Sequence, residues 1–227
     1  MDIREHEALI EALNDPAQFE AYREPVDGYR PGIVPRLLGG LLVFFGNLVY
    51  GKRPSYLKFR SVEVIARVPY QSWVSAAYTM FTLFYSNERK ALELSHTARF
   101  GRLAQDNETM HVVVISQLAK KYVRANPLIH TVIPMLFAFG YFWASYWLFL
   151  LNRRWSYELN YCFESHAFEQ YSRFLEENEA ALKSRPIESD FLTWYGRHPR
   201  TEYEFFRSVR NDELVHRNAS IHQISAR

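Results

Sequence analysis

The feature that most constrains the fold of this chain is a run from Pro127 to Leu151 that is uncharged apart from the titratable His130. As a helix, this run is long enough to span a bilayer. A second apolar run, from Leu37 to Tyr50, is too short to span comfortably. The chain must therefore either bury two very apolar helices or place them against lipid.

Basic residues lie on both sides of the longer run: Lys120, Lys121 and Arg124 precede it, and Arg153 and Arg154 follow it. A spanning helix more often has its positive residues biased to one side of the membrane. Positive residues at both ends suit a helix that lies in the interface, with its apolar side in one leaflet. The neighbouring helices also carry many charges and could not follow the run through lipid. We therefore favour two in-plane membrane helices, and a spanning helix stays open as the alternative.

Composition narrows the function classes. The net charge of +2 gives no reason to expect a nucleic-acid partner. The single cysteine, Cys162, excludes an internal disulfide framework and cannot by itself form a thiolate metal site. The N-terminus is acidic and lacks an apolar core, so we expect neither a secretory signal nor a transit peptide. Membrane contact must then come from within the fold.

The chain as a whole is typical of an all-α protein. Helices are predicted near residues 31–50, 55–85, 88–122, 127–151, 154–182 and 201–221. Pro69 and Pro134 fall inside two of these helices, and each should kink its helix or split it. Residues 1–30 hold eight acidic side chains against three arginines and are predicted to form a polar arm. Residues 31–227 are predicted to form one helical domain.

Two Glu-x-x-His pairs, Glu108 with His111 and Glu213 with His216, are candidate metal ligands. At this spacing both side chains share one face of a helix, so a carboxylate and an imidazole can converge on one ion. Chance alone can produce such a pair, as the third copy from Glu93 to His96 shows. Two pairs become informative when two further helices each add an inward glutamate, which is the pattern of di-iron carboxylate bundles.

Glu63 and Glu164 are the candidates for these further glutamates, because each stands in a largely apolar stretch. A carboxylate in such a stretch is either buried with a partner or at the edge of a helix face. Taken alone, each is more often exposed or ion-paired. A length argument favours Glu164: in an antiparallel bundle with a rise of about 1.5 Å per residue, Glu108 and Glu164 reach the same height, roughly 21 Å from one end.

Four carboxylates and two histidines suit iron or manganese. Two such metals, about 3.5–4 Å apart and with open positions, can bind and reduce dioxygen. Asp212 could accept a hydrogen bond from a ligand histidine, or it could be a solvated carboxylate. Tyr171 lies two turns after Glu164 and could donate an electron or a hydrogen bond, or it could be a packed core ring.

The chain resembles the alternative oxidases, and more closely their plastid terminal oxidase branch. Four blocks carry this resemblance, in family order and within roughly residues 35–222: VEVIARVPY from Val62, NETMH from Asn107, ESHAFEQY from Glu164 and RNDELVH from Arg210. The resemblance implies a ferritin-like four-helix bundle with a di-iron carboxylate centre, plus two membrane-interface helices.

The resemblance also implies roles for individual residues. The ligands of two iron ions would be Glu63, Glu108, His111, Glu164, Glu213 and His216. The tyrosine of the oxygen chemistry would be Tyr171, with Asn107, Asp212 and Trp194 close to the ligands. The quinol-binding positions would be Lys58, Val62 and His166. Lys58 and Val62 depart from the arginine and the leucine that are usual in the family, which affects quinone affinity more than oxygen chemistry.

The implied function is that of a quinol:oxygen oxidoreductase, which reduces dioxygen to water without pumping protons. Plastoquinol is favoured over ubiquinol as the electron donor. The expected form is a monotopic homodimer on the cytoplasmic or stromal face of a thylakoid or plasma membrane. A di-iron hydroxylase or desaturase acting on a lipid-like substrate uses the same ligands and is the main alternative. An iron-storage bundle, or a small integral membrane protein without metal, would leave the apolar runs or the glutamates unexplained.

Overall fold

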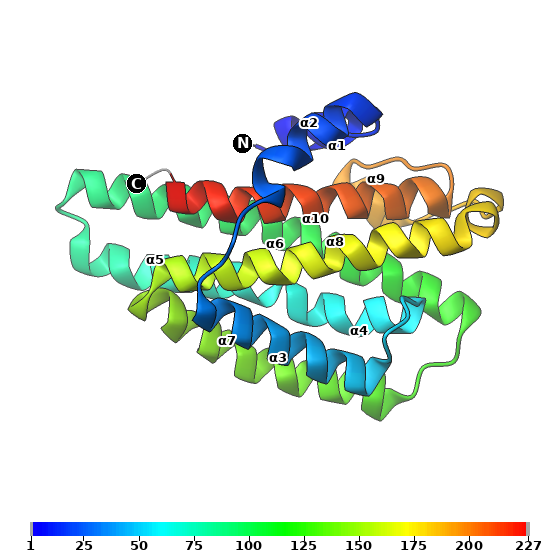
Figure 1. Ribbon diagram of the computed structural model, residues 1–227, viewed down its shortest axis with the longest axis horizontal. Helices are drawn as coiled ribbons and strands as arrows, with labels where there is room; N and C mark the ends of the chain where they lie inside the picture. Colours follow the sequence, from blue (N-terminus) through cyan, green and yellow to red (C-terminus); the bar gives the residue numbers. More distant parts are fainter. Residues whose placement is uncertain (1, 226–227) are drawn as a thin grey trace. The chain divides into compact units, whose positions relative to one another are not determined.

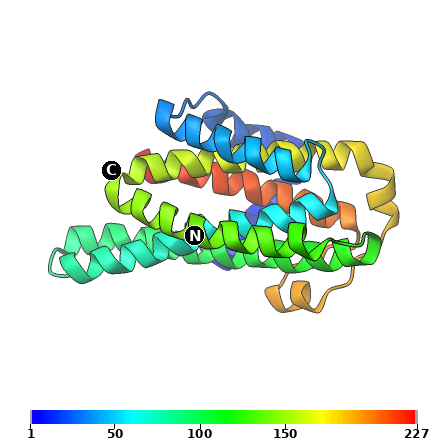
Figure 2. The same ribbon diagram turned by 90° about the horizontal axis from the view of Figure 1, so that it is seen from below.

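In the computed structural model, which describes residues 2–225, the regular elements are helices apart from one β-bridge between Pro186 and Thr201 (Figures 1 and 2). The predicted all-α fold class is confirmed. The chain forms two compact units: unit 1 consists of residues 1–56 and 158–227, and unit 2 of residues 57–157.

Unit 2 contains α4 (Tyr56–Ala66) apart from its first residue, α5 (Val68–Phe84), α6 (Glu88–Tyr122), the π-helix η1 (Leu128–Val132), α7 (Ile133–Leu151) and the first turn of α8 (Arg153–Ser184). The break between α4 and α5 confirms the split expected at Pro69, and the wider turns of η1 end just before Pro134. In both cases the proline lacks the N–H that would continue the preceding helix.

Helix α5 packs against both α6 and α7. Figure 2 shows α5 running alongside α6. The ring of Trp73 lies at the centre of this packing, fully buried and 5.0 Å from the ring of Tyr157 in an edge-on arrangement. Its Nε1 donates a hydrogen bond to Ser156 Oγ over 2.7 Å, so the one polar atom of the indole is satisfied.

Unit 1 contains α1 (Ile3–Ala12), α2 (Pro16–Asp27), α3 (Ile33–Tyr50), most of α8, α9 (Asp190–Tyr195) and α10 (Glu202–Ser225). Figure 1 shows α1 and α2 against α10, and the two short helices pack on it. Asp2 and Asp15 cap them, and Pro16 opens α2 at a position where its missing N–H costs nothing. The acidic first thirty residues therefore include two helices of unit 1; their separation from residues 31–227 as an arm stays a prediction.

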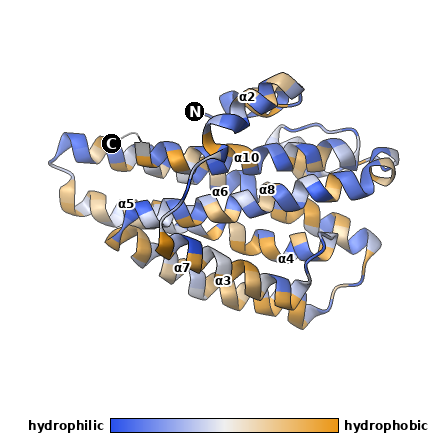
Figure 3. Ribbon diagram, viewed as in Figure 1, coloured by the Kyte–Doolittle hydropathy of each residue, from blue (hydrophilic) through white to orange (hydrophobic). Residues whose placement is uncertain are grey.

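The two apolar runs form helices whose surfaces are mostly exposed. Ile33–Tyr50 and Leu128–Leu151 are long and apolar enough to cross a membrane, and little of either is buried. Helix α3 begins at Ile33, before the start of the apolar run at Leu37, so the expectation that this run is too short to span is wrong by length and composition. Figure 3 shows both helices as predominantly hydrophobic. Their large apolar side chains include the exposed Leu48, Leu136 and Phe139. An apolar helix in a protein core would be buried, so these two helices are not ordinary core helices.

Candidate metal centre

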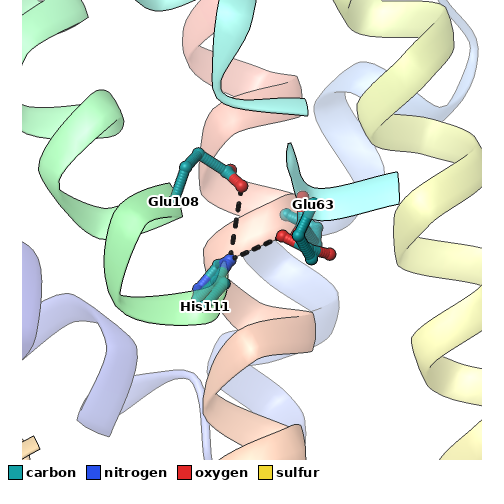
Figure 4. Close-up of side chains that lie close together, drawn as sticks. Glu63, Glu108 and His111 are labelled. Carbon is teal, nitrogen blue, oxygen red and sulfur yellow. Dashed lines mark ion pairs between the residues drawn. The ribbon is translucent and has the colours of Figure 1, made fainter. Parts of the chain in front are cut away.

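Three of the predicted ligands meet in unit 2: Glu63 on α4, and Glu108 and His111 on α6 (Figure 4). Nδ1 of His111 lies 3.4 Å from Oε2 of Glu63 and 3.4 Å from Oε2 of Glu108. All three side chains are at most 3% exposed. We call these residues the unit 2 triad.

The local sequence explains this arrangement. Glu108 and His111 are one helical turn apart on α6, so both side chains point to the same side of the helix. Glu63 joins them from α4, where Ser61 and Ile65, two residues to either side, are also buried. The chain thus buries two carboxylates that face one imidazole nitrogen.

The other three predicted ligands meet in unit 1: Glu164 on α8, and Glu213 and His216 on α10. Each offers a ligand atom within 4.8 Å of the others, and none is more than 1% exposed. We call these residues the unit 1 triad. Each triad thus joins one of the predicted Glu-x-x-His pairs to one further predicted glutamate, whereas the metal-ligand role of these residues and the equal height of Glu108 and Glu164 stay predictions.

The unit 1 triad has a supporting residue that the sequence analysis missed. Nδ2 of Asn160 donates hydrogen bonds to Oε1 of Glu164 and to Oγ of Ser220, both over 3.1 Å. Ser220 in turn donates to the carbonyl oxygen of His216 over 2.9 Å. The spacing of four residues between Asn160 and Glu164 could have indicated this contact, because such residues are neighbours on a helix.

Asp212 is fully buried, so the alternative of a solvated carboxylate is wrong. Its two oxygens accept hydrogen bonds from Arg197, and Oδ1 lies 2.8 Å from Nε2 of His6. Burial by itself lowers the pKa of Arg197, but the carboxylates of Asp212 and Glu7 outweigh this effect and raise the pKa above its ordinary value. The guanidinium therefore stays charged. Sequence reasoning missed His6, Glu7 and Arg197, since nothing in their spacing connects them to Asp212.

The remaining predicted residues differ in their surroundings. Asn107 and Tyr171 are fully buried, and the ring of Tyr171 packs on Phe206 with 6.2 Å between ring centres. Trp194 is 77% exposed on α9 and packs on Phe191, so the structure does not bring it to the buried triad of its unit.

The predicted quinol-binding residues occupy both units. Lys58 is buried and Val62 half-buried on α4, while His166 is half-buried on α8. The third Glu-x-x-His pair is a surface feature, as expected of a chance match: Glu93 forms an ion pair with Arg153 over 2.6 Å, and His96 is exposed.

The donor set of the triads fits a metal. Two carboxylates that share a water-free space are unfavourable unless a positive charge lies between or beside them. Hard carboxylate oxygens together with imidazole nitrogens suit iron or manganese, and the one cysteine of the sequence, Cys162, cannot by itself form a thiolate metal site.

Comparisons with known proteins agree with this chemistry. A family model described as alternative oxidase matches residues 47–225, which include both triads. The chain is also 24% identical over 182 residues to Ubiquinol oxidase 4, chloroplastic/chromoplastic, of Arabidopsis thaliana. That alignment covers 71% of this chain and 49% of the relative, so the chain spans about half the length of that protein. No solved structure matches the chain.

Proposed function

This chain belongs to the alternative oxidase family, and we propose that it is a non-haem di-iron quinol oxidase. Two quinols would supply four electrons and four protons, and one dioxygen would leave as two waters. The observation that carries the proposal is the pair of buried Glu/His triads, on four helices that all lie within the family match. The name of the Arabidopsis relative, a ubiquinol oxidase, supports a quinol as the electron donor.

We assign the iron ligands to the two triads: Glu63, Glu108 and His111 in unit 2, and Glu164, Glu213 and His216 in unit 1. A di-iron centre held by these residues would supply the redox chemistry and the open coordination positions through which electrons from the quinol reach dioxygen. The residues of the chain keep water out, since all six side chains are at most 3% exposed. In unit 1, Asn160 holds the carboxylate of Glu164 in one orientation.

Tyr171 is proposed as the catalytic tyrosine. It is fully buried and lies seven residues after Glu164 on α8, which places both side chains on one side of the helix. A phenol in this position can donate a hydrogen bond or an electron during dioxygen reduction. Asn107 and Asp212, both buried and both next to a ligand in the sequence, are proposed to support the ligands.

The quinol is proposed to bind beside Lys58, Val62 and His166, with plastoquinol favoured over ubiquinol. The chain is proposed to be monotopic, with α3 and the run from η1 to α7 each lying in the interface of a thylakoid or plasma membrane, on its cytoplasmic or stromal face. A basic pocket of about 470 Å³, lined by residues that include Arg60, Lys120, Lys121 and Arg124, lies where α6 ends before η1 and fits a headgroup layer. A homodimer is the proposed assembly.

The proposal is tested by iron analysis and oxygen uptake of the purified protein. We expect about two irons per chain, the value that the six-ligand assignment requires, and oxygen uptake with plastoquinol or ubiquinol analogues. Water should be the reduced product, whereas an oxygenated organic product would favour the hydroxylase alternative. A chain without iron, or one that takes up no oxygen with any quinol, would contradict the proposal.

The ligand assignment has its own test. The Glu164→Ala variant should lose iron, because a ligand and its charge are removed. Its rate of oxygen uptake should fall at least roughly 100-fold. Glu169→Ala is the matched control, since Glu169 is an exposed glutamate on the same helix. Full activity of the Glu164 variant would show that this residue is not a ligand.

A further inference from the structure

The N-terminal helix α1 contributes two side chains to a buried polar network next to the unit 1 triad. His6 is 1% exposed, and its Nε2 lies 2.8 Å from Oδ1 of Asp212. Arg197 donates two hydrogen bonds to Asp212, over 2.5 and 3.0 Å. The same guanidinium donates two more to Glu7, over 2.8 and 2.6 Å. The network therefore joins α1 to α10 through the segment between α9 and α10.

The charges in this network determine which atom of His6 carries a proton. Asp212 is paired with a guanidinium and is therefore a carboxylate, which only accepts hydrogen bonds. Nε2 of His6 must then be the donor. Removing the His6 ring would leave one hydrogen-bond position of a fully buried carboxylate empty, which is costly in a place that water does not reach.

The network is directly connected to the proposed ligands. Asp212 precedes Glu213 in the chain and lies one helical turn before His216 on α10. The ring of His6 also lies along the ring of His216, with 6.2 Å between ring centres and 25° between planes. His6 thus contacts the carboxylate at one end of this turn, and its ring lies roughly parallel to the imidazole at the other end.

Helix α1 is held in this place by contacts that do not involve His6. Ile10 and Leu13 form an apolar cluster with Val215 of α10. Nδ2 of Asn211 donates to the carbonyl oxygen of Ile10 over 3.3 Å. A mutation in these contacts can therefore weaken the packing of α1 on α10 without removing the His6 ring.

We infer that His6 is a positioning residue of the metal centre, acting through Asp212 and the ring of His216. The inference rests on the proposed function, because it takes His216 and Glu213 as iron ligands. Helix α1, at residues 3–12, lies outside the family match of residues 47–225. In this chain the N-terminal helix is therefore part of the metal centre's support.

The test compares iron retention by the full-length protein and its variants during dialysis against increasing chelator. His6→Ala should retain iron roughly 10- to 100-fold less well, as is typical when a group that orients a metal ligand is lost. The magnetic circular dichroism of its diferrous form should change as well, because the orientation of His216 changes. His6→Gln should restore most of the retention, since its amide N–H can donate to Asp212.

Two controls separate positioning from stability. Ile10→Ala loosens α1 without removing the hydrogen bond to Asp212, and His96→Ala removes an exposed histidine of α6. Wild-type iron retention and spectrum in His6→Ala would overturn the inference. So would an iron loss in His6→Ala no greater than in Ile10→Ala at an equal loss of melting temperature. Wild-type protein that binds iron but oxidises no quinol would contradict the proposed function alone, and the iron readouts would still decide the role of His6.

Discussion

At the residue scale, burial distinguishes polar side chains that have the same sequence spacing. Glu93 and Glu108 each begin a Glu-x-x-His pair on α6, yet one forms a surface ion pair and the other is fully buried. A solvated carboxylate costs nothing, whereas a buried one needs partners or a cation. The spacing of residues is identical in the two pairs, and burial, not spacing, distinguishes the pair that joins the unit 2 triad.

The thiol of Cys162 illustrates the same effect on a titrating group. Burial, aided by the nearby carboxylate of Glu158, raises the pKa of Cys162 from 9.0 to about 11. At pH 8 the folded protein should therefore react roughly 100-fold more slowly with iodoacetamide than the denatured chain, because the thiolate is the reactive form. The measurement is the alkylation rate against pH, and a midpoint near 9 in the folded state would contradict the expectation.

The raised pKa of Cys162 also makes the free energy of unfolding depend on pH. Because the pKa is higher in the folded state, the unfolded chain loses the proton first as pH rises. The contribution of Cys162 to stability is therefore complete below pH 9 and is lost as pH rises to about 11. Urea unfolding of the wild type and of Cys162→Ala across this range should show the difference.

At the scale of elements, small residues set how closely helices approach. A Cβ on Gly39 of α3 would lie only 2.9 Å from Cβ of Cys162 on α8, whereas a Cβ on the neighbouring Gly40 would meet nothing within 4 Å. A Cβ atom cannot rotate away, so α3 and α8 would have to separate. Gly39 therefore fixes the distance between the apolar helix α3 and the ligand-bearing helix α8.

The two glycines make a matched pair for a stability test. Gly39→Ala should destabilise unit 1 by about 1–3 kcal/mol, which is the usual cost of overpacking. Gly40→Ala should be neutral or stabilising by up to about 1 kcal/mol, because alanine favours a helix. Thermal unfolding in the same detergent measures both, and equal melting temperatures for the two variants would contradict the close approach.

For the whole molecule, the exposed apolar helices are the dominant surface feature. Two helices that are mostly exposed, one in each unit, are unfavourable in water and favourable against lipid. Membrane association is also a property of the alternative oxidase family to which the chain belongs. The basic residues near α7 agree with a location at a headgroup surface.

Binding to lipid vesicles tests this surface. Leu136→Glu and Phe139→Glu each place a charge on an exposed position of α7, so the partition coefficient of the protein onto vesicles should fall roughly 30-fold per charge, which corresponds to about 2 kcal/mol. Leu92→Glu is the control, because Leu92 is similarly exposed on α6, outside the apolar runs. Unchanged binding of the two α7 variants would show that α7 does not contact lipid.

The sequence by itself predicted the long helices, the two apolar runs and the six candidate ligands, but not the short helices α1, α2 and α9. These features are local: a helix follows from the periodicity of neighbouring residues, a split from one proline, and a ligand pair from a spacing of three. For Glu63 and Glu164, the apolar neighbours left open whether the side chain is buried or at the edge of a helix face, and the structure buries both.

Only the tertiary structure decided which distant side chains support these ligands. His6 and Asp212 are separated by 206 residues, and Arg197 joins Glu7 to Asp212 across a similar distance. No periodicity connects such positions, because their contact depends on how α1 packs against α10. The same reason explains Trp194, whose place near the ligands was implied by family resemblance but whose ring is exposed on α9. Local spacing specified the chemistry of the ligands, and long-range packing specified the residues that hold them.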